Sequence, residues 1–354
     1  MWPTQLVQAV SPNRWSERSL RSRLLAIVGI AGLLITASLA TWLSIRGGQP
    51  STPTLYGTAR STPGAVWAGD GSRYALVAVQ GAGPSSNNAD MAYDRTRGVV
   101  VLWDHGCANL VMGFQGGCAD PVNRTWTWDG RTWTAQSTRA NPASVGPGAM
   151  LFDKRLGRVV YVNGTGQAWS WTGSDWKILS MPGSPAVRRD SGGATSTFAV
   201  GYEEAGDALV FVLPTGTWSW DGARWTAIGG GIQPGEARPD AHIVYDGAHS
   251  RLVYVGARYT WTWEGDRWQS HDQPPIAGGT LAYDSARASV MLVELDSASC
   301  DRSACRTATW SWSSTGWTRQ EAGKEAPAFP LTRSGAYAPP MAFDEARGVA
   351  LIFI

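Results

Sequence analysis

A two-part repeat runs through most of this chain and limits what it can fold into. The first part is a strand pair joined by a short turn after an acidic residue, as in MAYDRTRGVVVL at 91–102. The second part is a tryptophan-rich hairpin, as in TWTWDGRTW at 125–133. The first Trp residues of five such hairpins stand 43, 49, 43 and 49 residues apart. A period of this length predicts a β-propeller or a solenoid in which every element is a strand.

The two ends of the repeat predict how a ring would close. The last repeat stops at 354 after its first part, whereas a degenerate hairpin, VWAGDGSRY at 66–74, precedes the first complete repeat. Two open half-repeats would expose unpaired strand edges, which favour aggregation. We therefore predict an all-β fold, a six-bladed β-propeller over residues 64–354. Its split closing blade takes two inner strands from the carboxyl-terminal end and two outer strands from the amino-terminal side, with Trp67 and Tyr74 in Trp positions.

Tryptophan is unusually frequent, at 20 residues against 10 Tyr and 7 Phe. Fifteen of these Trp residues lie in the five hairpins. A two-residue turn would pair Trp133 with Trp126, and a four-residue turn would pair it with Trp128; all three share one face either way. Fifteen exposed indoles would form apolar patches larger than a soluble monomer tolerates. We therefore predict that they pack between blades, the alternative being platforms on which sugars stack.

The amino-terminal segment predicts attachment to a membrane. Residues 24–45 contain no charge and would span ~33 Å as a helix, enough for a bilayer core. Because Arg residues concentrate before this stretch, we expect 1–23 to be a cytoplasmic tail, 24–45 a transmembrane signal-anchor helix and 46–63 a flexible linker. The propeller would then lie outside the cytoplasm at the cell membrane. The alternative is a secreted protein cleaved after Ser38-Leu39-Ala40.

Charge argues against a nucleic-acid partner. Five Arg residues and Glu17 give residues 1–46 a formal charge of +4, so the +2 of the whole chain leaves −2 for the remainder. A slightly acidic body has no basic surface for a phosphate backbone.

The pattern A-Y-D-x-x-R-G-x-V-V-L at 92–102, together with T-W-x-W-D-G-x-x-W, resembles the bacterial kelch-type propellers, which share their blade with the central domain of galactose oxidase. The resemblance covers 64–354, although a clear Gly-Gly pair after the second strand is missing. It implies a propeller but no single function, because the family mixes enzymes, adhesins and interaction scaffolds. Copper-radical oxidation needs two Tyr and two His at one metal. The four His residues do not suit this, so we predict no oxidase chemistry and no cofactor.

Two blades carry insertions between their second and third strands. The distance from the acid to the first Trp is 15 or 16 residues in three repeats, but 32 in the first and 26 in the fifth. One insertion contains Cys107 and Cys118, and the other contains Cys300 and Cys305. Outside the cytoplasm such pairs predict two disulfides. A metal site using His105 and Cys107 is the rival interpretation; four ligands at zinc-type spacing are absent, so we predict none.

Propeller geometry places second-to-third strand loops and inter-blade loops on the same face. We expect this loop-rich face to bind partners, close to the bilayer because the linker is short. The predicted function is non-enzymatic binding of an envelope or cell-surface protein or glycan through varied loops on a rigid ring. The candidate contact residues are Trp103, Arg188, Arg189, Arg238, Arg258, Asp301 and Arg302.

The repeated acids are predicted to be structural, because each precedes a turn where a carboxylate accepts local backbone N–H bonds. These acids are Asp94, Asp153, Glu203, Asp246, Asp284 and Asp344. The alternative function is a glycan-active hydrolase or lyase with acids on the loop-rich face, drawn from Glu236, Glu294, Asp296 and Asp301. Glycoside hydrolysis needs two carboxyl groups ~5–9.5 Å apart. No catalytic motif selects such a pair, so no catalytic residue is assigned.

Overall fold

The structure is a computed structural model in which Ala59–Ile354 form one compact unit. It describes residues 65–77, 82–84, 88–111, 117–143, 148–185, 199–213, 216–232, 236, 243–271, 279–301, 304–321, 326–330 and 339–353. The predicted tail, transmembrane helix and linker, residues 1–63, lie outside this set. Within it, no helix has the length and apolar character needed to cross a bilayer.

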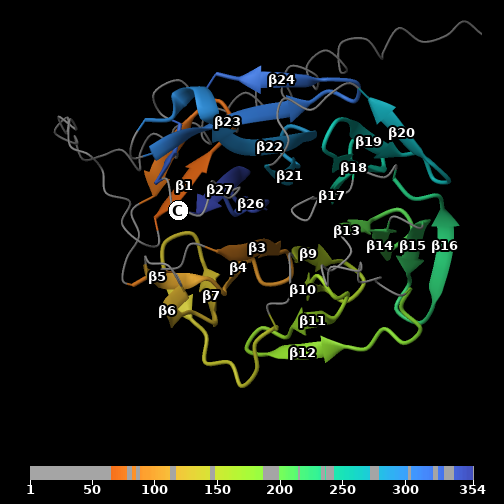
Figure 1. Cartoon of the computed structure of the whole chain (residues 1–354), viewed down its shortest axis with the longest axis horizontal. Helices are drawn as coiled ribbons and strands as arrows, with labels where there is room; N and C mark the ends of the chain where they lie inside the picture. The colour runs from red at the N-terminus through yellow and green to blue at the C-terminus, as the bar shows by residue number, and fades with distance from the viewer. Residues whose placement is uncertain are drawn as a thin grey trace, which may run out of the picture. The chain divides into compact units, whose positions relative to one another are not determined.

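Six antiparallel sheets form the blades of a propeller, each with four strands in order and one of them with an added fifth strand (Figure 1). We number the blades in chain order. Blade 1 contains β3 (Ala89–Asp94), β4 (Val99–Asp104), β7 (Arg124–Trp128) and β8 (Trp133–Ala135). Blade 2 contains β9 (Ala149–Asp153), β10 (Arg158–Val162), β11 (Ala168–Trp171) and β12 (Trp176–Leu179). Blade 3 contains β13 (Ala199–Glu203), β14 (Ala208–Leu213), β15 (Gly216–Trp220) and β16 (Trp225–Gly229).

The other half of the ring is built in the same way. Blade 4 contains β17 (Ile243–Asp246), β18 (Arg251–Val255), β19 (Thr260–Trp263) and β20 (Trp268–His271). Blade 5 contains β21 (Thr280–Asp284), β22 (Ser289–Asp296), β23 (Ala304–Trp312) and β24 (Trp317–Gln320). Blade 6 combines β26 (Met341–Asp344) and β27 (Val349–Phe353) with β1 (Val66–Gly69) and β2 (Tyr74–Val77).

Blade 6 confirms the predicted split closure. Its strand order is β2-β1-β27-β26, so the two inner strands come from the carboxyl-terminal end of the chain. Where β1 meets β27 inside this blade, Val66 pairs with Phe353 and Trp67 pairs with Ile352. The innermost strands β3, β9, β13, β17, β21 and β26 contact one another in turn and back to β3, which closes the ring.

The tryptophan hairpins use a four-residue turn in all five blades that carry them. In blade 1, Trp128 pairs with Trp133 across the hairpin, with ring centroids 5.2 Å apart. The other four pairs have centroid separations of 5.2–5.4 Å. None of the fifteen indoles is exposed, and the most buried, Trp171, is 0% exposed. The predicted packing role is confirmed.

A hydrogen bond links the third Trp of a hairpin to the preceding blade. Its indole Nε1 donates to the hydroxyl of the Thr that precedes the first Trp there, at 2.8 Å in each case: Trp176 to Thr125, Trp268 to Thr217 and Trp317 to Thr260. In blade 6, Tyr74 takes the Trp position and its hydroxyl lies 2.7 Å from that of Thr309. Blade 3 is different: Ala168 replaces the Thr, and the buried Nε1 of Trp225 has no partner.

The repeated acids fix the turns between first and second strands, as predicted. Asp94 is 0% exposed, and its Oδ1 accepts the backbone N–H groups of Thr96 and Arg97, each at 3.1 Å. Its Oδ2 accepts Nη1 of Arg97 at 2.8 Å. Nη2 of Arg97 then donates to the backbone oxygen of Thr172 in blade 2, at 2.7 Å. We call such an acid and Arg, joined to the outer turn of the next blade, an Asp–Arg bracket.

Candidate functional site

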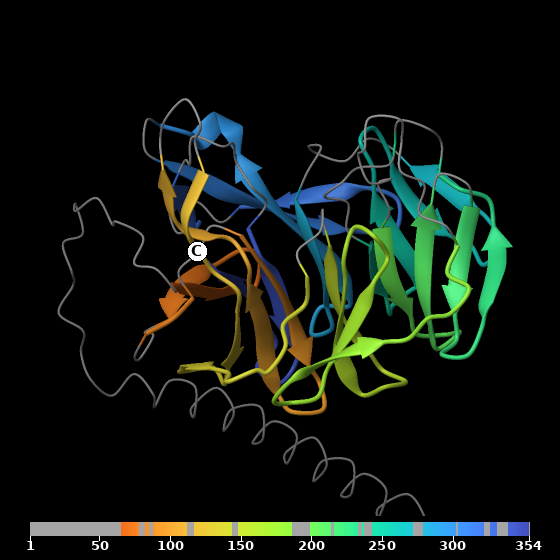
Figure 2. The same ribbon diagram turned by 60° about the horizontal axis from the view of Figure 1, so that its bottom comes forward.

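Two elaborated hairpins rise from the same face of the ring, on either side of blade 6 (Figure 2). One is the extra pair β5 (Cys107–Val111) and β6 (Gly117–Pro121) of blade 1. The other is the extension of β22 and β23, where Glu294 pairs with Ala308 and Asp296 with Arg306. A short 3-10 helix, η1 (Ser297–Ser299), and the added strand β25 (Ala328–Pro330) complete it. These insertions make one face of the ring loop-rich.

The second hairpin carries a disulfide between Cys300 and Cys305, which confirms one of the two predicted bridges. Asp301 caps the intervening turn, because its Oδ1 accepts the N–H of Ala304 at 2.9 Å. The side chains of Cys107 and Cys118 lie outside the described residues, so their disulfide stays a prediction. The structure does show that the strands bearing them pair with each other.

Trp103 is not a surface contact, which corrects its assignment as a binding residue. It is 0% exposed at the end of β4. Its ring stacks on His105 at 4.1 Å and meets Tyr161 of blade 2 edge-on at 4.6 Å. Its Nε1 donates to Oδ1 of Asn123 at 2.9 Å. Trp103 therefore packs between two blades.

Arg258 is exposed on the loop between β18 and β19, as a binding residue would be. Its side chain is 74% exposed, and the neighbouring Tyr259 is 44% exposed. The buried Glu236 holds this loop, because its Oε2 accepts the N–H of Arg258 at 3.0 Å and that of Tyr259 at 3.2 Å. Sequence analysis missed Tyr259, and it took Glu236 for a potential catalytic acid rather than a loop anchor.

Four other predicted contact residues, Arg188, Arg189, Arg238 and Arg302, lie outside the described residues. Asp301 is exposed at the tip of the disulfide hairpin. Of the seven predicted contacts, the structure therefore places Arg258 and Asp301 on the loop-rich face and Trp103 inside the ring. Arg258 belongs to blade 4 and Asp301 to blade 5.

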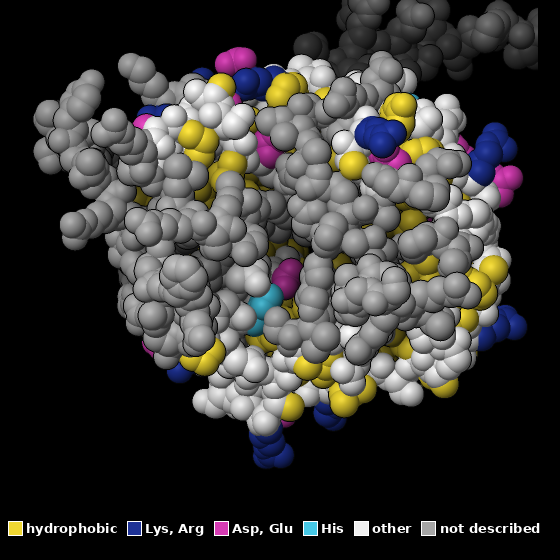
Figure 3. All heavy atoms as spheres, viewed as in Figure 1, with side chains coloured by type: hydrophobic (Ala, Val, Ile, Leu, Met, Phe, Trp, Pro, Cys, Tyr) yellow, Lys and Arg dark blue, Asp and Glu magenta, His cyan; other side chains and the backbone are white. Residues whose placement is uncertain are grey.

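A histidine and an acid meet on this face, and sequence analysis did not pair them. His105 Nε2 lies 2.8 Å from Asp90 Oδ2, joining the end of β4 to the start of β3. Figure 3 looks onto one face of the ring and shows a His side chain beside an acidic side chain near its middle. The Tyr161 hydroxyl nearby is buried without a hydrogen-bond partner, and burial, then Asp90, raises its pKa.

Glu294 is the most perturbed carboxyl group described. It is 2% exposed on β22, and its Oε1 accepts Nε1 of Trp310 at 2.7 Å. Its Oε2 is buried without a partner. Burial raises the pKa of Glu294 to about 7, and the charge of Asp296 adds to the effect. Asp296 itself is bonded to Arg319 at 2.6 Å.

No group of three or more His, Cys, Asp or Glu side chains suited to a metal ion occurs in the described part of the chain. The four acids proposed for glycan chemistry also have separate local roles. Glu236 anchors a loop, Asp301 caps a turn and Asp296 pairs with Arg319, and among the described residues Glu294 is the one of the four with a buried oxygen that has no hydrogen-bond partner.

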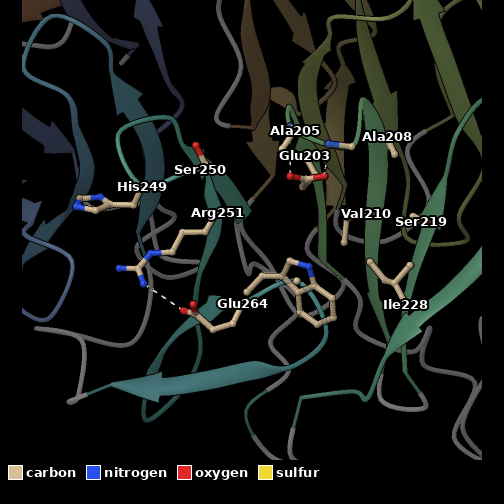
Figure 4. Close-up of a pocket in the computed structure, with 13 residues that line it drawn as sticks. Glu203, Ala205, Ala208, Val210, Ser219, Ile228, His249, Ser250, Arg251 and Glu264 are labelled. Carbon is tan, nitrogen blue, oxygen red and sulfur yellow. Dashed lines mark hydrogen bonds and ion pairs between the residues drawn. The ribbon is translucent and has the colours of Figure 1, made fainter.

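A cleft of about 650 Å³ opens between blades 3 and 4 on the opposite face, where the short turns lie. Figure 4 shows Glu203, Val210 and Ile228 on the blade 3 side, opposite Arg251 and Glu264 of blade 4. Nη1 of Arg251 donates to Oε1 of Glu264 at 3.1 Å. The Thr262 hydroxyl, followed by Arg251, holds the pKa of Glu264 below its usual value of 4.5. Sequence analysis had assigned no role to this face.

Comparison with known proteins supports the fold alone. No protein-family model matches the chain, and no curated protein matches it. A putative TolB from Agrobacterium tumefaciens is similar at 10% identity over 83% of this chain and 99% of that one, with a TM-score of 0.50. A Bacteroides thetaiotaomicron protein of unknown function has 11% identity over 82% and 76% of the two chains and a TM-score of 0.49. YjhT has 10% identity over 70% and 87%, with a TM-score of 0.46. The chain is thus a six-bladed β-propeller protein.

Proposed function

We propose that this chain is a membrane-anchored, extracytoplasmic propeller that binds an envelope or cell-surface protein or glycan through its loop-rich face, without catalysis. The observation that carries this proposal is the pair of elaborated hairpins on that face, one of them closed by the Cys300–Cys305 disulfide. Kelch-type propellers, which the repeat resembles, use the same ring for many functions, so the assignment rests on the face rather than on the fold.

The exposed corner formed by Arg258 and Tyr259 supports this proposal. Arg and Tyr side chains often dominate binding energy at interfaces. Both are exposed here, while Glu236 fixes the backbone between β18 and β19 through two hydrogen bonds. A loop that is ordered before binding loses less conformational entropy when a partner arrives. The rigid ring therefore favours recognition by exposed side chains.

Site-specific photo-cross-linking in cells tests this proposal. A photoreactive residue in place of Tyr259 in the full-length chain is expected to give adducts with an envelope protein or glycan. The matched control replaces Leu76, which is 58% exposed on the outer strand of blade 6. Equal adduct yields at both positions would contradict the proposal. Mass spectrometry of the same preparation checks the anchor, since a mature chain that begins at Thr41 would mean cleavage.

Glu294 favours a second candidate, a glycan-active hydrolase or lyase. A buried carboxyl group with a pKa of about 7 is suited to give or take a proton near neutral pH. A turnover assay of the full-length chain on a polysaccharide panel separates the two functions. Activity that is lost in Glu294→Gln and kept in Asp301→Asn would support the enzyme. Binding of a polysaccharide without turnover would support the non-catalytic binding function.

A further inference from the structure

The Asp–Arg bracket recurs in four of the six blades. In each, an Arg from the turn after the first strand bonds Oδ2 of a buried Asp, at 2.6–3.1 Å: Arg97 on Asp94, Arg155 on Asp153, Arg287 on Asp284 and Arg347 on Asp344. The carboxylates are at most 1% exposed. The bracket therefore places a guanidinium at the seam between one blade and the next.

Each of these guanidinium groups reaches the outer hairpin turn of the following blade. Arg347 donates to the backbone oxygen of Asp129, and Arg287 lies 3.4 Å from the carboxylate of Asp70. A Cβ atom added to Gly173 or Gly222 would overlap the guanidinium of Arg97 or Arg155. Glycine in the outer turn thus makes room for an incoming Arg, and that Arg fills the seam.

Blades 3 and 4 depart from this rule in different ways. In blade 4, His249 takes the Arg position, and its Nδ1 lies 2.7 Å from Oδ2 of Asp246. In blade 3, Gly206 takes the position and brings no side chain at all. Its acid is Glu203, whose Oε1 and Oε2 accept the N–H groups of Ala205 and Gly206 at 3.2 and 2.6 Å.

The 650 Å³ cleft lies at the seam that follows blade 3, where Gly206 replaces the bracket Arg. Glu203 and Gly206 line one side, and Glu264 and Gly265 of the next outer turn line the other. A Cβ on Gly265 would meet nothing within 4 Å, in contrast to Gly173 and Gly222. Glu203 remains half-buried, whereas the bracketed Asp residues are covered. Blade 4 therefore has the same outer turn as the other blades, but no bracket Arg from blade 3 occupies the space beside it.

We propose that this seam is a binding slot for an arginine side chain supplied by a partner protein, which would occupy the place that Arg97, Arg155, Arg287 and Arg347 occupy at the other seams. The slot lies on the turn-rich face, so the proposal goes beyond recognition by the loop-rich face and does not depend on it. A carboxylate and a backbone oxygen are the two acceptors that Arg97 uses, and Glu203 and the turn of Glu264 offer the same pair of groups.

The rest of the lining suits the stem and the charge of an arginine. Half-buried Ile228 gives apolar surface for the methylene groups, and Ala208, Val210 and Trp263, each at most 6% exposed, form the covered wall behind it. Two basic side chains line the cleft and both are already engaged: Arg251 by Glu264 and by the backbone oxygen of Ser314 at 3.0 Å, and His249 by Asp246 at 2.7 Å. Glu203 forms no ion pair within the described structure, so its charge is left for the ligand.

Fluorescence anisotropy with the full-length chain tests the slot. The probe is a fluorescein-labelled Gly-Ser-Gly-Arg-Gly-Ser-Gly peptide, and the reference peptides carry Gln or Lys in place of Arg. We expect the Arg peptide to bind at least ~10-fold more tightly than the Gln peptide, the change that loss of one charged hydrogen bond produces. It should also bind more tightly than the Lys peptide, because a planar guanidinium bonds two acceptors at once.

Two variants and one matched control complete the design. Gly206→Arg fills the slot from within the chain, because a Cβ there approaches only the flexible carboxyl end of Glu203. Glu203→Gln removes the charge and keeps the shape. Both are expected to lose the preference for the Arg peptide. Gly230→Arg adds the same charge at an exposed glycine with open space and should bind normally. Equal binding of the Arg and Gln peptides, or unchanged binding by Glu203→Gln, would overturn the slot. Equal binding of the Lys peptide would overturn its preference for guanidinium.

Discussion

The seams between blades 1 and 2 and between blades 3 and 4 are built from the same repeat and differ at the acid, Asp94 or Glu203, and at the position of the bracket Arg. At the first seam, Arg97 joins the buried Asp94 to the backbone oxygen of Thr172. At the second, Gly206 stands where that Arg would be, and a cleft of about 650 Å³ replaces it. The Trp–Thr bond is kept at both seams, from Trp176 to Thr125 and from Trp268 to Thr217.

The comparison distinguishes the contacts that the two seams share from the contact that the seam between blades 3 and 4 lacks. Covered indoles occur in all five Trp hairpins, so packing of these rings is the feature that the blades share, whereas the Trp–Thr bond is missing between blades 2 and 3. The Asp–Arg bracket is absent from two of the six blades, blade 3 with Gly206 and blade 4 with His249, so it is dispensable for the fold. A position that the fold can lose without opening the ring is available for another role, which here is ligand binding.

The largest expected effect is a difference in how much one buried Trp stabilises each of the two seams. Trp171 is 0% exposed between blades 1 and 2, so Trp171→Ala should cost about 3–5 kcal/mol of unfolding free energy. Trp263 already borders the cleft, so Trp263→Ala should cost clearly less. Urea denaturation of both variants measures the difference. Equal losses would mean that the cleft does not loosen the packing between blades 3 and 4.

Glu294 extends the comparison to a buried carboxyl group with no cation bonded to its free oxygen. Its pKa rises from 4.5 in the unfolded chain to about 7, so its stabilising effect is complete below pH 4.5 and is lost as the pH rises through 7. Glu294→Gln stays neutral throughout and should raise Tm at pH 8, relative to wild type, by several degrees, at roughly 2–4 °C per kcal/mol. Thermal melts at pH 4.5 and pH 8 check this. The same Tm difference between variant and wild type at both values would contradict the raised pKa.

Removing the bracket Arg of blade 1 should make its contact with blade 2 resemble the seam between blades 3 and 4, which has no such Arg. Arg97→Ala leaves the buried Asp94 without its cation and should cost roughly 2–3 kcal/mol, a value reduced by the partial exposure of Arg97. Arg224→Ala is the control, because that Arg pairs with Asp221 while 81% exposed and should change little. Chemical denaturation compares the two. A loss as small as that of the control would show that the bracket contributes nothing to stability.

The smallest expected effect comes from restoring the Trp–Thr bond between blades 2 and 3, where Ala168 replaces the Thr. Ala168→Thr would place a hydroxyl near the unpartnered Nε1 of Trp225 and should stabilise the ring by about 1 kcal/mol. Thr125→Val, which removes the matching bond from Trp176, should destabilise it by about the same amount or more. Opposite signs in the two denaturation curves are expected. Destabilisation by both would show that the space beside Ala168 is too small for a larger side chain.

Most of the fold followed from the sequence because the repeat is periodic and its ends are complementary. The six blades, the split closure and the structural acids needed only strand alternation, turn residues and the absence of open edges. The turn length of the Trp hairpins did not follow, because two-residue and four-residue turns put all three indoles on one face. Only the pairing of Trp128 with Trp133 distinguishes them.

The site followed less well, because burial depends on the neighbouring blade. Trp103 looks like an exposed residue at the edge of an insertion until Tyr161 of the next blade is placed against it. Glu294 looks like a loop acid, yet it lies in β22, which continues to Asp296. The vacant slot did leave a signal in the sequence. Glu203 is the one Glu among the six repeated acids, and Gly206 stands where three other repeats have Arg.

The pairing of β1 with β27 inside blade 6 also determines when the ring can be completed. Trp67 and Ile352, which pair across it, are 352 − 67 = 285 residues apart in the chain. At about 5–20 residues per second, a ribosome takes tens of seconds to go from one to the other. Until β27 has been made, β1 has its hairpin partner β2 available but lacks its inner neighbour. A nascent chain halted before β27 would therefore lack the strand that pairs with β1 and closes the ring.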